Sequence, residues 1–335
     1  MKVLVTGAGG HLGFNLVNAL LGAGHAVRGS IRSRADAAAV ARLETLGSVE
    51  VVGARLESDA ELLAAMEGMD AVMHTAAVYL LFAPGREDEI VAASVDGVDR
   101  AMRAAKAARV GRVVLTSSVV ALPLRPRGAQ PATEADWASD LRVPYFRAKT
   151  RAEQRAWDLA GELGIDLVTV LPGAFAGPGF VRNTPTIDLF EAIMKGAMEI
   201  AAPPVVYPYV DVRDVAEAHL LALAPTAEGR YIAVAEPLPT LAEIARLMHS
   251  IDTSIRPPLM TLPSFVLPAL PFLETVNSWI KKTPRTLTPE MAATMRSGRF
   301  DMTSARIRSE LGWAPKVSLR QSLSDTMTAL RGKAG

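Results

Sequence analysis

The sequence contains no cysteine in its 335 residues, and its charges nearly cancel. The lack of cysteine excludes disulfides, thiolate metal sites and a cysteine nucleophile, and it agrees with a cytoplasmic location, which we expect for this protein. Lysine and arginine together number 36 and aspartate and glutamate 35, which leaves a formal net charge of +1. Because this balance favours neither a nucleic acid nor an anionic membrane surface, we expect a small-molecule partner and no nucleic acid.

Long uninterrupted apolar stretches and metal-ligand spacings are also missing. The apolar run that opens the chain reaches Gly7 too soon for a membrane span or a signal segment, and it predicts a buried strand. The most apolar segment, 257–280, carries prolines throughout, so we expect short helices packed in a small lobe and no stable membrane insertion. An amphipathic contact of this segment with a membrane or a partner is the alternative. The histidines are scattered and no metal is expected; they are His11, His25, His74, His219 and His249.

Short apolar runs alternate with amphipathic stretches of helix length through the first half of the chain. The runs expected to be strands are Val3 to Thr6, Ala26 to Ile31, Ala71 to His74, Val113 to Ser117 and, further on, Asp166 to Leu171. The expected helices are Leu12 to Ala23, Ala60 to Met66, Ile90 to Ala108 and Tyr145 to Leu163. Continuous apolar strands that alternate with helices predict a parallel sheet with right-handed crossovers. The fold class is therefore α/β, with a Rossmann-type doubly wound parallel sheet.

The alternation breaks down after Pro172, where prolines become frequent. Residues 205–224 again have the pattern of a strand and a helix, and 230–234 that of a last strand, so we expect the chain to return to the sheet. The Rossmann domain would then comprise 1–172 plus about 205–236. A smaller, discontinuous and mostly helical C-terminal lobe would comprise 173–204 plus about 237–335.

A glycine-rich loop, Thr6-Gly7-Ala8-Gly9-Gly10-His11-Leu12-Gly13, connects the first strand to the first helix. Gly7 permits a tight turn, Gly10 lets the backbone approach a pyrophosphate, and Gly13 allows close packing of helix and sheet. The helix then presents free N–H groups and the positive end of its dipole to the phosphates. A strand before the loop and a helix after it favour a dinucleotide site over an ordinary glycine-rich turn.

The end of the second strand indicates which dinucleotide binds. An NAD site needs a carboxylate there for the ribose 2′-hydroxyl, whereas a 2′-phosphate needs cations and small hydroxyls. This chain has Ser30-Ile31-Arg32-Ser33, and its first acid is Asp36. NADP(H) is therefore the predicted cofactor, with Ser30, Arg32 and Ser33 at the 2′-phosphate. The alternative is that these residues form only a solvated surface turn.

Three polar residues predict carbonyl chemistry. Reduction of a carbonyl by hydride needs a proton donor at the oxygen, and a tyrosine is a weak donor near neutrality unless a cation lowers its pKa. Tyr145 and Lys149 stand four apart at the start of a helix, so they share one face. Ser118 follows the fourth apolar run at the carboxyl edge of the sheet, where such sheets bind ligands. We identify Ser118, Tyr145 and Lys149 as the catalytic residues.

With these motifs the chain resembles the extended short-chain dehydrogenase/reductases, and within them the branch similar to dihydroflavonol 4-reductase, cinnamoyl-CoA reductase and 3β-hydroxysteroid dehydrogenase. The resemblance covers nearly the whole chain and gives the same three residues their catalytic roles. It implies that Asp214 anchors the returning segment and that the backbone after Pro172 lies along the nicotinamide. The matching stretches are TGAGGHLG (6–13), DAVMHTAA (70–77), VVLTSS (113–118), YFRAK (145–149), LPGAFAGPG (171–179), YVDVRDVAEAH (209–219) and FDMTSARIRSELGW (300–313).

This chain departs from the family pattern in three places. In the family an Asp-Leu pair follows the third strand, and its carboxylate binds adenine; this chain has Arg55-Leu56 at that place. Adenine is therefore expected to stack on the guanidinium or to bond Glu57 or Asp59. Ser94 replaces an asparagine, and any ordering role passes to its shorter hydroxyl or to water. Tyr207 replaces the arginine with which sugar-nucleotide epimerases hold a diphosphate.

The resemblance and the motifs together give two sets of binding residues. The cofactor set is Gly7, Gly10, His11, Leu12, Gly13, Ser30, Arg32, Ser33, Arg55, Leu56, Thr75, Ala76, Ala77, Thr116, Tyr145, Lys149, Pro172, Gly173 and Ala174. The substrate set, which lines the expected cleft with apolar and amphipathic side chains, is Tyr79, Phe82, Ser118, Phe175 and Tyr207. Arg213 adjoins the anchor Asp214 and is expected to pair locally, so it would not hold a substrate phosphate.

These expectations favour an NADP(H)-dependent oxidoreductase that reduces a ketone or aldehyde of an apolar or aromatic small molecule, and that oxidises the alcohol in reverse. The first alternative is an NAD(P)-dependent epimerase, dehydratase or isomerase that uses the same residues with another substrate. A second is a dinucleotide-sensing protein without turnover, against which the intact serine, tyrosine and lysine argue. The chain is expected to act as a monomer or as a homodimer.

Overall fold

The computed structural model describes residues 1–76, 85–263, 290, 293–294 and 298–333. A parallel seven-stranded sheet runs through the larger part of the molecule in the order β10-β6-β5-β4-β1-β2-β3. Its strands are β1 Lys2–Thr6, β2 Ala26–Ile31, β3 Val49–Gly53, β4 Ala71–His74, β5 Arg112–Thr116, β6 Leu167–Pro172 and β10 Gly229–Ala233. The strand order reverses direction between β1 and β4, which confirms the doubly wound Rossmann-type fold.

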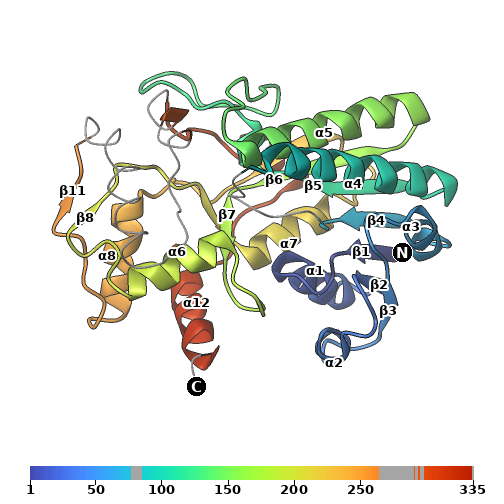
Figure 1. Cartoon of the computed structure of the whole chain (residues 1–335), viewed down its shortest axis with the longest axis horizontal. Coiled ribbons are helices and arrows are strands. Elements are labelled where there is room, and N and C mark those ends of the chain that lie inside the picture. The colour runs from blue at the N-terminus through green and yellow to red at the C-terminus, as the bar shows by residue number, and fades with distance from the viewer. Residues whose placement is uncertain (77–84, 264–289, 291–292, 295–297, 334–335) are drawn as a thin grey trace.

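Helices cover both faces of this sheet (Figure 1). One face carries α1 His11–Gly22 and α7 Val212–Leu221, which pack on alternate residues of β1 such as Val3 and Val5. The other carries α3 Asp59–Met66, α4 Glu87–Ala107 and α5 Pro144–Leu163, which pack on Leu4 and Val72. Strands buried on both sides need apolar residues at every position, and this requirement produced the continuous runs in the sequence.

The edge strand β3 and the helix α2 Ala37–Glu44 were not among the elements expected from the apolar runs. Only Val51 of β3 is buried, and a glutamate interrupts the sequence VEVVG, so this strand has no continuous apolar run. In α2 only Leu43 is buried. An inner strand is recognised by a continuous apolar run because both of its faces are buried, and an edge strand lacks this pattern.

The smaller lobe lies at the other end of the molecule from the N-terminus (Figure 1). It contains α6 Pro185–Met194, α8 Leu241–Ile251 and α12 Leu319–Lys333, whose apolar faces enclose Phe190, Ile244 and Leu323. Two short parallel pairs accompany these helices: β7 Ala174–Ala176 with β9 Tyr209–Asp211, and β8 Ala201–Ala202 with β11 Met260–Thr261. The strand expected within 205–224 is thus β9, which pairs with β7, and the chain returns to the main sheet only at β10.

The C-terminal segment returns to the sheet through Asp214, in the first turn of α7. Its carboxylate accepts hydrogen bonds from the backbone N–H groups of Lys316 (2.8 Å) and Val317 (3.2 Å). The indole of Trp313, which is fully buried beside α11 Ala305–Leu311, donates to the Asp214 carbonyl oxygen at 2.9 Å. Arg213 pairs with Asp211, in agreement with the predicted local pairing, and also with Asp325 of α12. Asp214 therefore acts as the structural anchor that the resemblance implied.

Part of the chain on which the sequence made predictions lies outside the described residues. This applies to most of the apolar segment 257–280, and to Ala77, Tyr79 and Phe82 of the expected binding sets. Within the described residues, no helix has both the length and the apolar character needed to cross a membrane.

Candidate active site

The glycine loop is packed so closely that larger residues would not fit. Gly7 has a φ of +70°, which favours glycine, and a Cβ on Gly13 would lie 2.2 Å from the carbonyl oxygen of Gly7. Gly10 precedes α1 in an extended conformation and has no side chain with which to cap it. The first-turn N–H groups of a helix have no intrahelical partners, so they are available to a phosphate. The loop thus fits the pyrophosphate of a dinucleotide.

Side chains from α1 and α2 join this loop to the segment after β7. His11 and Asn15 each donate to the carbonyl oxygen of Pro178 at 3.1 Å, and Arg42 donates to that of Gly179. The Arg42 guanidinium also lies over the Phe14 ring, 3.6 Å from its centroid. Burial lowers the pKa of His11 to about 4, so the ring is neutral near neutral pH. The phosphate loop and the wall of the second lobe are therefore held together.

The residues expected at the 2′-phosphate differ in exposure. The side chain of Arg32 is 80% exposed and forms an ion pair with Glu57 at 3.1 Å, and Ser33 is exposed beside it. Ser30 is only 2% exposed. Arg32 and Ser33 are thus the members of this group that a ligand can reach at the surface.

Arg55, expected at the adenine, forms a two-pronged ion pair with Glu61 in α3. Its Nε lies 3.0 Å from Oε1 of that carboxylate, and its second amino group also donates to Oε1. An arginine held by a carboxylate in this way presents a flat guanidinium in a fixed orientation. The neighbouring Leu56 lines a cavity with Ala76 and Tyr145.

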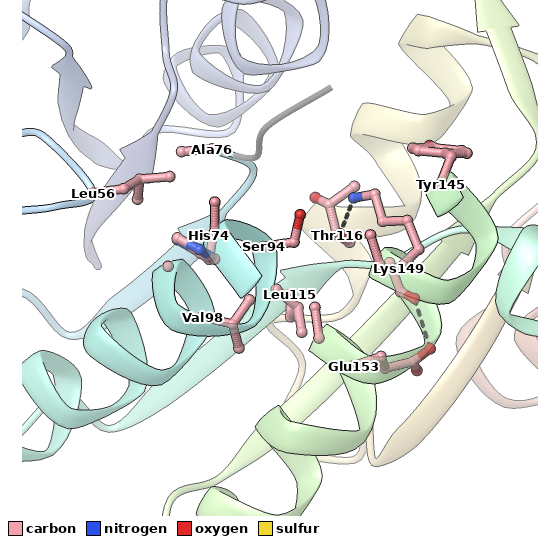
Figure 2. Close-up of a pocket in the computed structure, with 15 residues that line it drawn as sticks. Leu56, His74, Ala76, Ser94, Val98, Leu115, Thr116, Tyr145, Lys149 and Glu153 are labelled. Carbon is pink, nitrogen blue, oxygen red and sulfur yellow. Dashed lines mark hydrogen bonds between the residues drawn. The ribbon is translucent and has the colours of Figure 1, made fainter. Parts of the chain in front are cut away.

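Tyr145 and Lys149 lie on one face of α5 and line that cavity together (Figure 2). Pro144 occupies the start of the helix, where it costs no backbone hydrogen bond. The Lys149 amino group is directed to the backbone of Thr116, whose carbonyl oxygen it approaches at 3.4 Å. Burial lowers the pKa of Lys149 to about 8. A phenol and a buried lysine amino group therefore line one cavity beside the carboxyl end of β5.

Ser118 lies just beyond that strand end. Its backbone is extended and its hydroxyl oxygen accepts a hydrogen bond from the Val120 N–H at 3.3 Å, so it caps the short helix η1 Val119–Ala121. The side chain is buried, and its hydroxyl hydrogen is still available to a carbonyl oxygen. Ser118 is not among the residues that line the cavity of Tyr145 and Lys149.

The cavity has polar residues that the sequence did not single out for its wall. His74 ends β4, Ser94 lies on α4, and Glu153 follows Lys149 by one further turn of α5. The remaining wall is largely apolar and comes from residues such as Ala93, Gly97, Val98, Leu115, Ala148 and Ala152. The spacing 145, 149 and 153 could have revealed Glu153, because positions four apart share a helix face.

The backbone expected along the nicotinamide runs from Pro172 into β7. A Cβ on Gly173 would lie 2.7 Å from the carbonyl oxygen of Pro208, so the chain needs glycine where these segments meet. Phe175 lies on β7 with its ring centroid 5.7 Å from that of His11, and the Tyr207 hydroxyl donates to Thr186 at 3.3 Å. Both rings are partly buried. No group of three potential metal ligands occurs in the part of the chain that the structure describes.

Comparison with known proteins gives consistent matches. The model of the NAD dependent epimerase/dehydratase family matches residues 3–235. Cinnamoyl-CoA reductase 1 of Arabidopsis thaliana is 35% identical over 259 residues, 73% of this chain and 71% of that protein. Sterol demethylase protein B of Methylococcus capsulatus is 31% identical over 99% of this chain and 98% of its own length. The structure of yeast methylglyoxal/isovaleraldehyde reductase Gre2 in complex with NADPH has a TM-score of 0.79 at 21% identity, covering 100% of this chain and 99% of that one.

Two substitutions in α1 test whether the glycine loop binds the dinucleotide. Gly13→Ala should weaken dinucleotide binding by at least about tenfold, because its Cβ would displace the Gly7 carbonyl and the N–H groups beside it. Gly22→Ala, at the end of the same helix, is the control, since no described atom lies within 4 Å of its Cβ. Calorimetric titration with NADPH measures both. Equal affinity of the Gly13→Ala variant and the wild type would contradict the pyrophosphate assignment.

Proposed function

The chain belongs to the NAD-dependent epimerase/dehydratase family, within the extended short-chain dehydrogenase/reductases, and from this premise we propose that it is an NADP(H)-dependent carbonyl reductase. Its substrate would be a ketone or aldehyde of an apolar or aromatic small molecule, with alcohol oxidation as the reverse reaction. The observation that carries the proposal is the pairing of Tyr145 with the buried Lys149 on one face of α5, at the carboxyl end of β5.

The proposed roles follow from the chemistry of these groups. When bound, the nicotinamide cofactor supplies a hydride to the carbonyl carbon. Tyr145 donates its phenolic proton to the carbonyl oxygen, and the Lys149 ammonium stabilises the phenolate that remains. Ser118 donates a hydrogen bond to the same oxygen and orients the substrate. In the reverse direction the Tyr145 phenolate accepts the proton of the alcohol.

The cofactor is proposed to be NADP(H) because the residues directly after β2, Arg32-Ser33-Arg34, include two cations and no acid before Asp36. Arg32 is mostly exposed on the surface, where its ion pair with an exposed glutamate is worth little. A 2′-phosphate would be a stronger partner than that glutamate, since it carries more charge and more acceptor oxygens. The relative in complex with NADPH has this fold and supports the same choice.

An apolar carbonyl substrate is supported by the names of the relatives and by the side chains available. Cinnamoyl-CoA reductases and tetraketide alpha-pyrone reductases are among the proteins that this chain resembles. We propose that Phe175 and Tyr207, with Tyr79 and Phe82, contact the substrate. Burial of a ring system against such side chains contributes about 25 cal/mol per Å². We thus propose that the cofactor binds to the Rossmann domain and the substrate binds against the smaller lobe.

An epimerase, dehydratase or isomerase remains the second candidate because the family model includes such enzymes. These enzymes would use Tyr145 and Lys149 in the same way but would need to hold a different substrate. A diphosphate requires fixed cations. Arg213 already pairs with Asp211 and Asp325, so it is not poised for that task. The reductase is therefore favoured.

The role of Tyr145 as proton donor is tested by Tyr145→Phe. Turnover of NADPH with a reducible carbonyl substrate should fall by about 10²–10⁴-fold, since general acid catalysis is removed while NADPH affinity is retained. Tyr231→Phe is the matched control, because the Tyr231 hydroxyl bonds Glu310 and is not part of the cavity wall. Turnover of Tyr145→Phe within about twofold of the wild type would rule out the assignment.

Cofactor choice is tested by Arg32→Ala. A charge-assisted bond to phosphate contributes about 1.5–3 kcal/mol, so the variant should bind NADPH at least about tenfold more weakly and NADH nearly unchanged. Arg86→Ala provides the control, because Arg86 is likewise an exposed arginine paired with an exposed glutamate. Fluorescence titration with both cofactors measures the effect. An equal loss for NADPH and NADH would show that Arg32 does not contact the 2′-phosphate.

The substrate class is tested with two measurements on the wild-type protein. We expect NADPH oxidation in the presence of aryl ketones or aldehydes, because ring burial and the Tyr145 proton donor suffice for such substrates. We expect no tight calorimetric binding of UDP-sugars, since Arg213, a candidate to hold the diphosphate, is already paired with Asp211 and Asp325. Tight UDP-sugar binding without reduction of any aryl carbonyl would favour the epimerase instead.

A further inference from the structure

His219, in α7, is fully buried, and its hydrogen bonds fix the direction of the Thr116 hydroxyl. Its Nδ1 lies 2.9 Å from the carbonyl oxygen of Val215, one turn earlier in the helix. A carbonyl oxygen can only accept, so the ring carries its hydrogen on Nδ1. Burial lowers the pKa of His219 to about 4, and in the neutral ring Nε2 is then an acceptor. Nε2 lies 2.7 Å from Oγ1 of Thr116, so the threonine must donate to it.

Thr116 is the last residue of β5, and it reaches one residue beyond the end of the neighbouring strand β4. β4 ends at the residue that pairs with Leu115, whereas Thr116 itself pairs with Val170 of β6. On the β6 side, the backbone N–H of Ser117 donates to the Val170 carbonyl oxygen at 2.8 Å. The bond to His219 attaches the same strand end to α7. The position of this strand end therefore depends on contacts from β6 and from α7.

The carbonyl oxygen of Thr116 receives the amino group of Lys149 from the other face of the sheet. The distance from Lys149 Nζ to this oxygen is 3.4 Å, and Figure 2 shows the lysine side chain directed to it. The helix α5, which carries Lys149, and the helix α7, which carries His219, pack on opposite faces of the sheet. Thr116 thus connects two buried groups, because its hydroxyl binds one and its carbonyl oxygen the other.

We propose that His219 is a positioning residue, which holds the Thr116 end of β5 where its carbonyl oxygen can accept a hydrogen bond from Lys149. Its effect on catalysis rests on the proposed reductase function, whereas its effect on the placement of Lys149 does not. The helix α7 is itself fixed close to this contact, because the Asp214 carboxylate holds the C-terminal segment on its first turn. His219 therefore links an anchored helix to the lysine, although it is not among the residues that line the cavity.

Loss of this support is expected to make Lys149 less basic. Burial already lowers the pKa of Lys149 to about 8, and a hydrogen bond from the ammonium to a carbonyl oxygen favours the charged form. The other titratable groups that line the cavity are His74, Tyr145 and Glu153, and all three are retained when the histidine of α7 is replaced. If the Thr116 carbonyl oxygen moves away, Lys149 loses its proton more readily. A neutral lysine stabilises the Tyr145 phenolate less, so the pKa of the phenol rises.

The first experiment observes Lys149 directly and needs no catalytic activity. In the full chain with ¹³C-labelled lysine, NMR titration should give Lys149 a pKa of about 8, and the Lys149→Arg variant identifies its signal. His219→Leu, which cannot accept a hydrogen bond, should lower this pKa by about 0.5 unit or more. Thr116→Val, which keeps the branched shape without the hydroxyl, should lower it to a similar extent and decides the matter if His219→Leu does not fold. An unchanged Lys149 pKa in either folded variant would overturn the proposal even if the enzyme is a reductase.

The second experiment asks whether the two residues act through one hydrogen bond. If they do, the double variant should lower the Lys149 pKa no further than either single variant, because the bond is already absent. Thr116→Ser should retain most of the wild-type value, since its hydroxyl can still donate to His219. His249→Leu is the control, because His249 in α8 likewise has its Nδ1 close to a carbonyl oxygen, that of Ile255 at 2.7 Å. Shifts that add up in the double variant, or an equal shift in His249→Leu, would contradict the proposed contact.

The third experiment measures the pH dependence of alcohol oxidation, in which the Tyr145 phenolate is proposed to accept the proton. Activity rises with pH through the pKa of that phenol. His219→Leu should move this rise to higher pH by about 0.5 unit, which is about a threefold loss of rate below it. His219→Gln should restore the profile in part, because its amide oxygen can accept from Thr116. A folded His219→Leu variant with the wild-type profile would overturn the effect on catalysis. Absence of alcohol oxidation by the wild type would instead contradict the proposed function, and the NMR titration would still decide on the placement of Lys149.

Discussion

The position of the proposed catalytic groups depends on a buried ion pair between Glu153 in α5 and Arg230 in β10. Their side chains are 1% and 7% exposed, and the carboxylate lies 2.9 Å from the guanidinium. Glu153 also accepts hydrogen bonds from Ser117 after β5 and from Thr169 in β6. A buried charge is tolerated only when it is fully paired, so the four groups have to meet in one arrangement. That arrangement fixes α5 against three strands and places Tyr145 and Lys149 two turns and one turn before Glu153.

Burial from solvent sets the protonation states of the ionisable groups near the site. Burial lowers the pKa of Lys149 to about 8 and those of His74 and His219 to about 4, because a charge is poorly solvated in the interior. The two histidines are therefore neutral hydrogen-bonding groups and not proton donors at neutral pH. Lys149 lines the same cavity as the Tyr145 phenol, which suits a tyrosine that is proposed to lose and regain a proton.

Hydrogen bonds between the two lobes fix the two sides of the candidate site relative to each other. His11, Asn15 and Arg42, from the elements that surround the glycine loop, bind backbone carbonyls at Pro178 and Gly179 in the second lobe. At the other border, Asp214 and Trp313 hold the C-terminal segment on α7. A cofactor on the loop and a substrate against the smaller lobe would thus be held by parts that are fixed to each other. Precise placement of this kind matters because hydride transfer requires close and aligned reactants.

Local features of the sequence were enough to predict the Rossmann-type sheet, the glycine loop and the identity of the proposed catalytic residues. Periodicity, turn chemistry and helix spacing act over a few residues, so Gly7, Gly13, Tyr145 and Lys149 could be assigned without knowing the fold.

The edge strand β3 was missed because burial on one side leaves a weaker pattern. The pairs Glu153 with Arg230 and Thr6 with His74 join residues far apart in the sequence, and only the packing of strands and helices brings them together. The sequence by itself determined the fold class and predicted the chemistry that is proposed for the chain. The tertiary structure decided the burial, partners and protonation of these groups, because solvation and hydrogen bonding depend on neighbours that the local sequence does not specify.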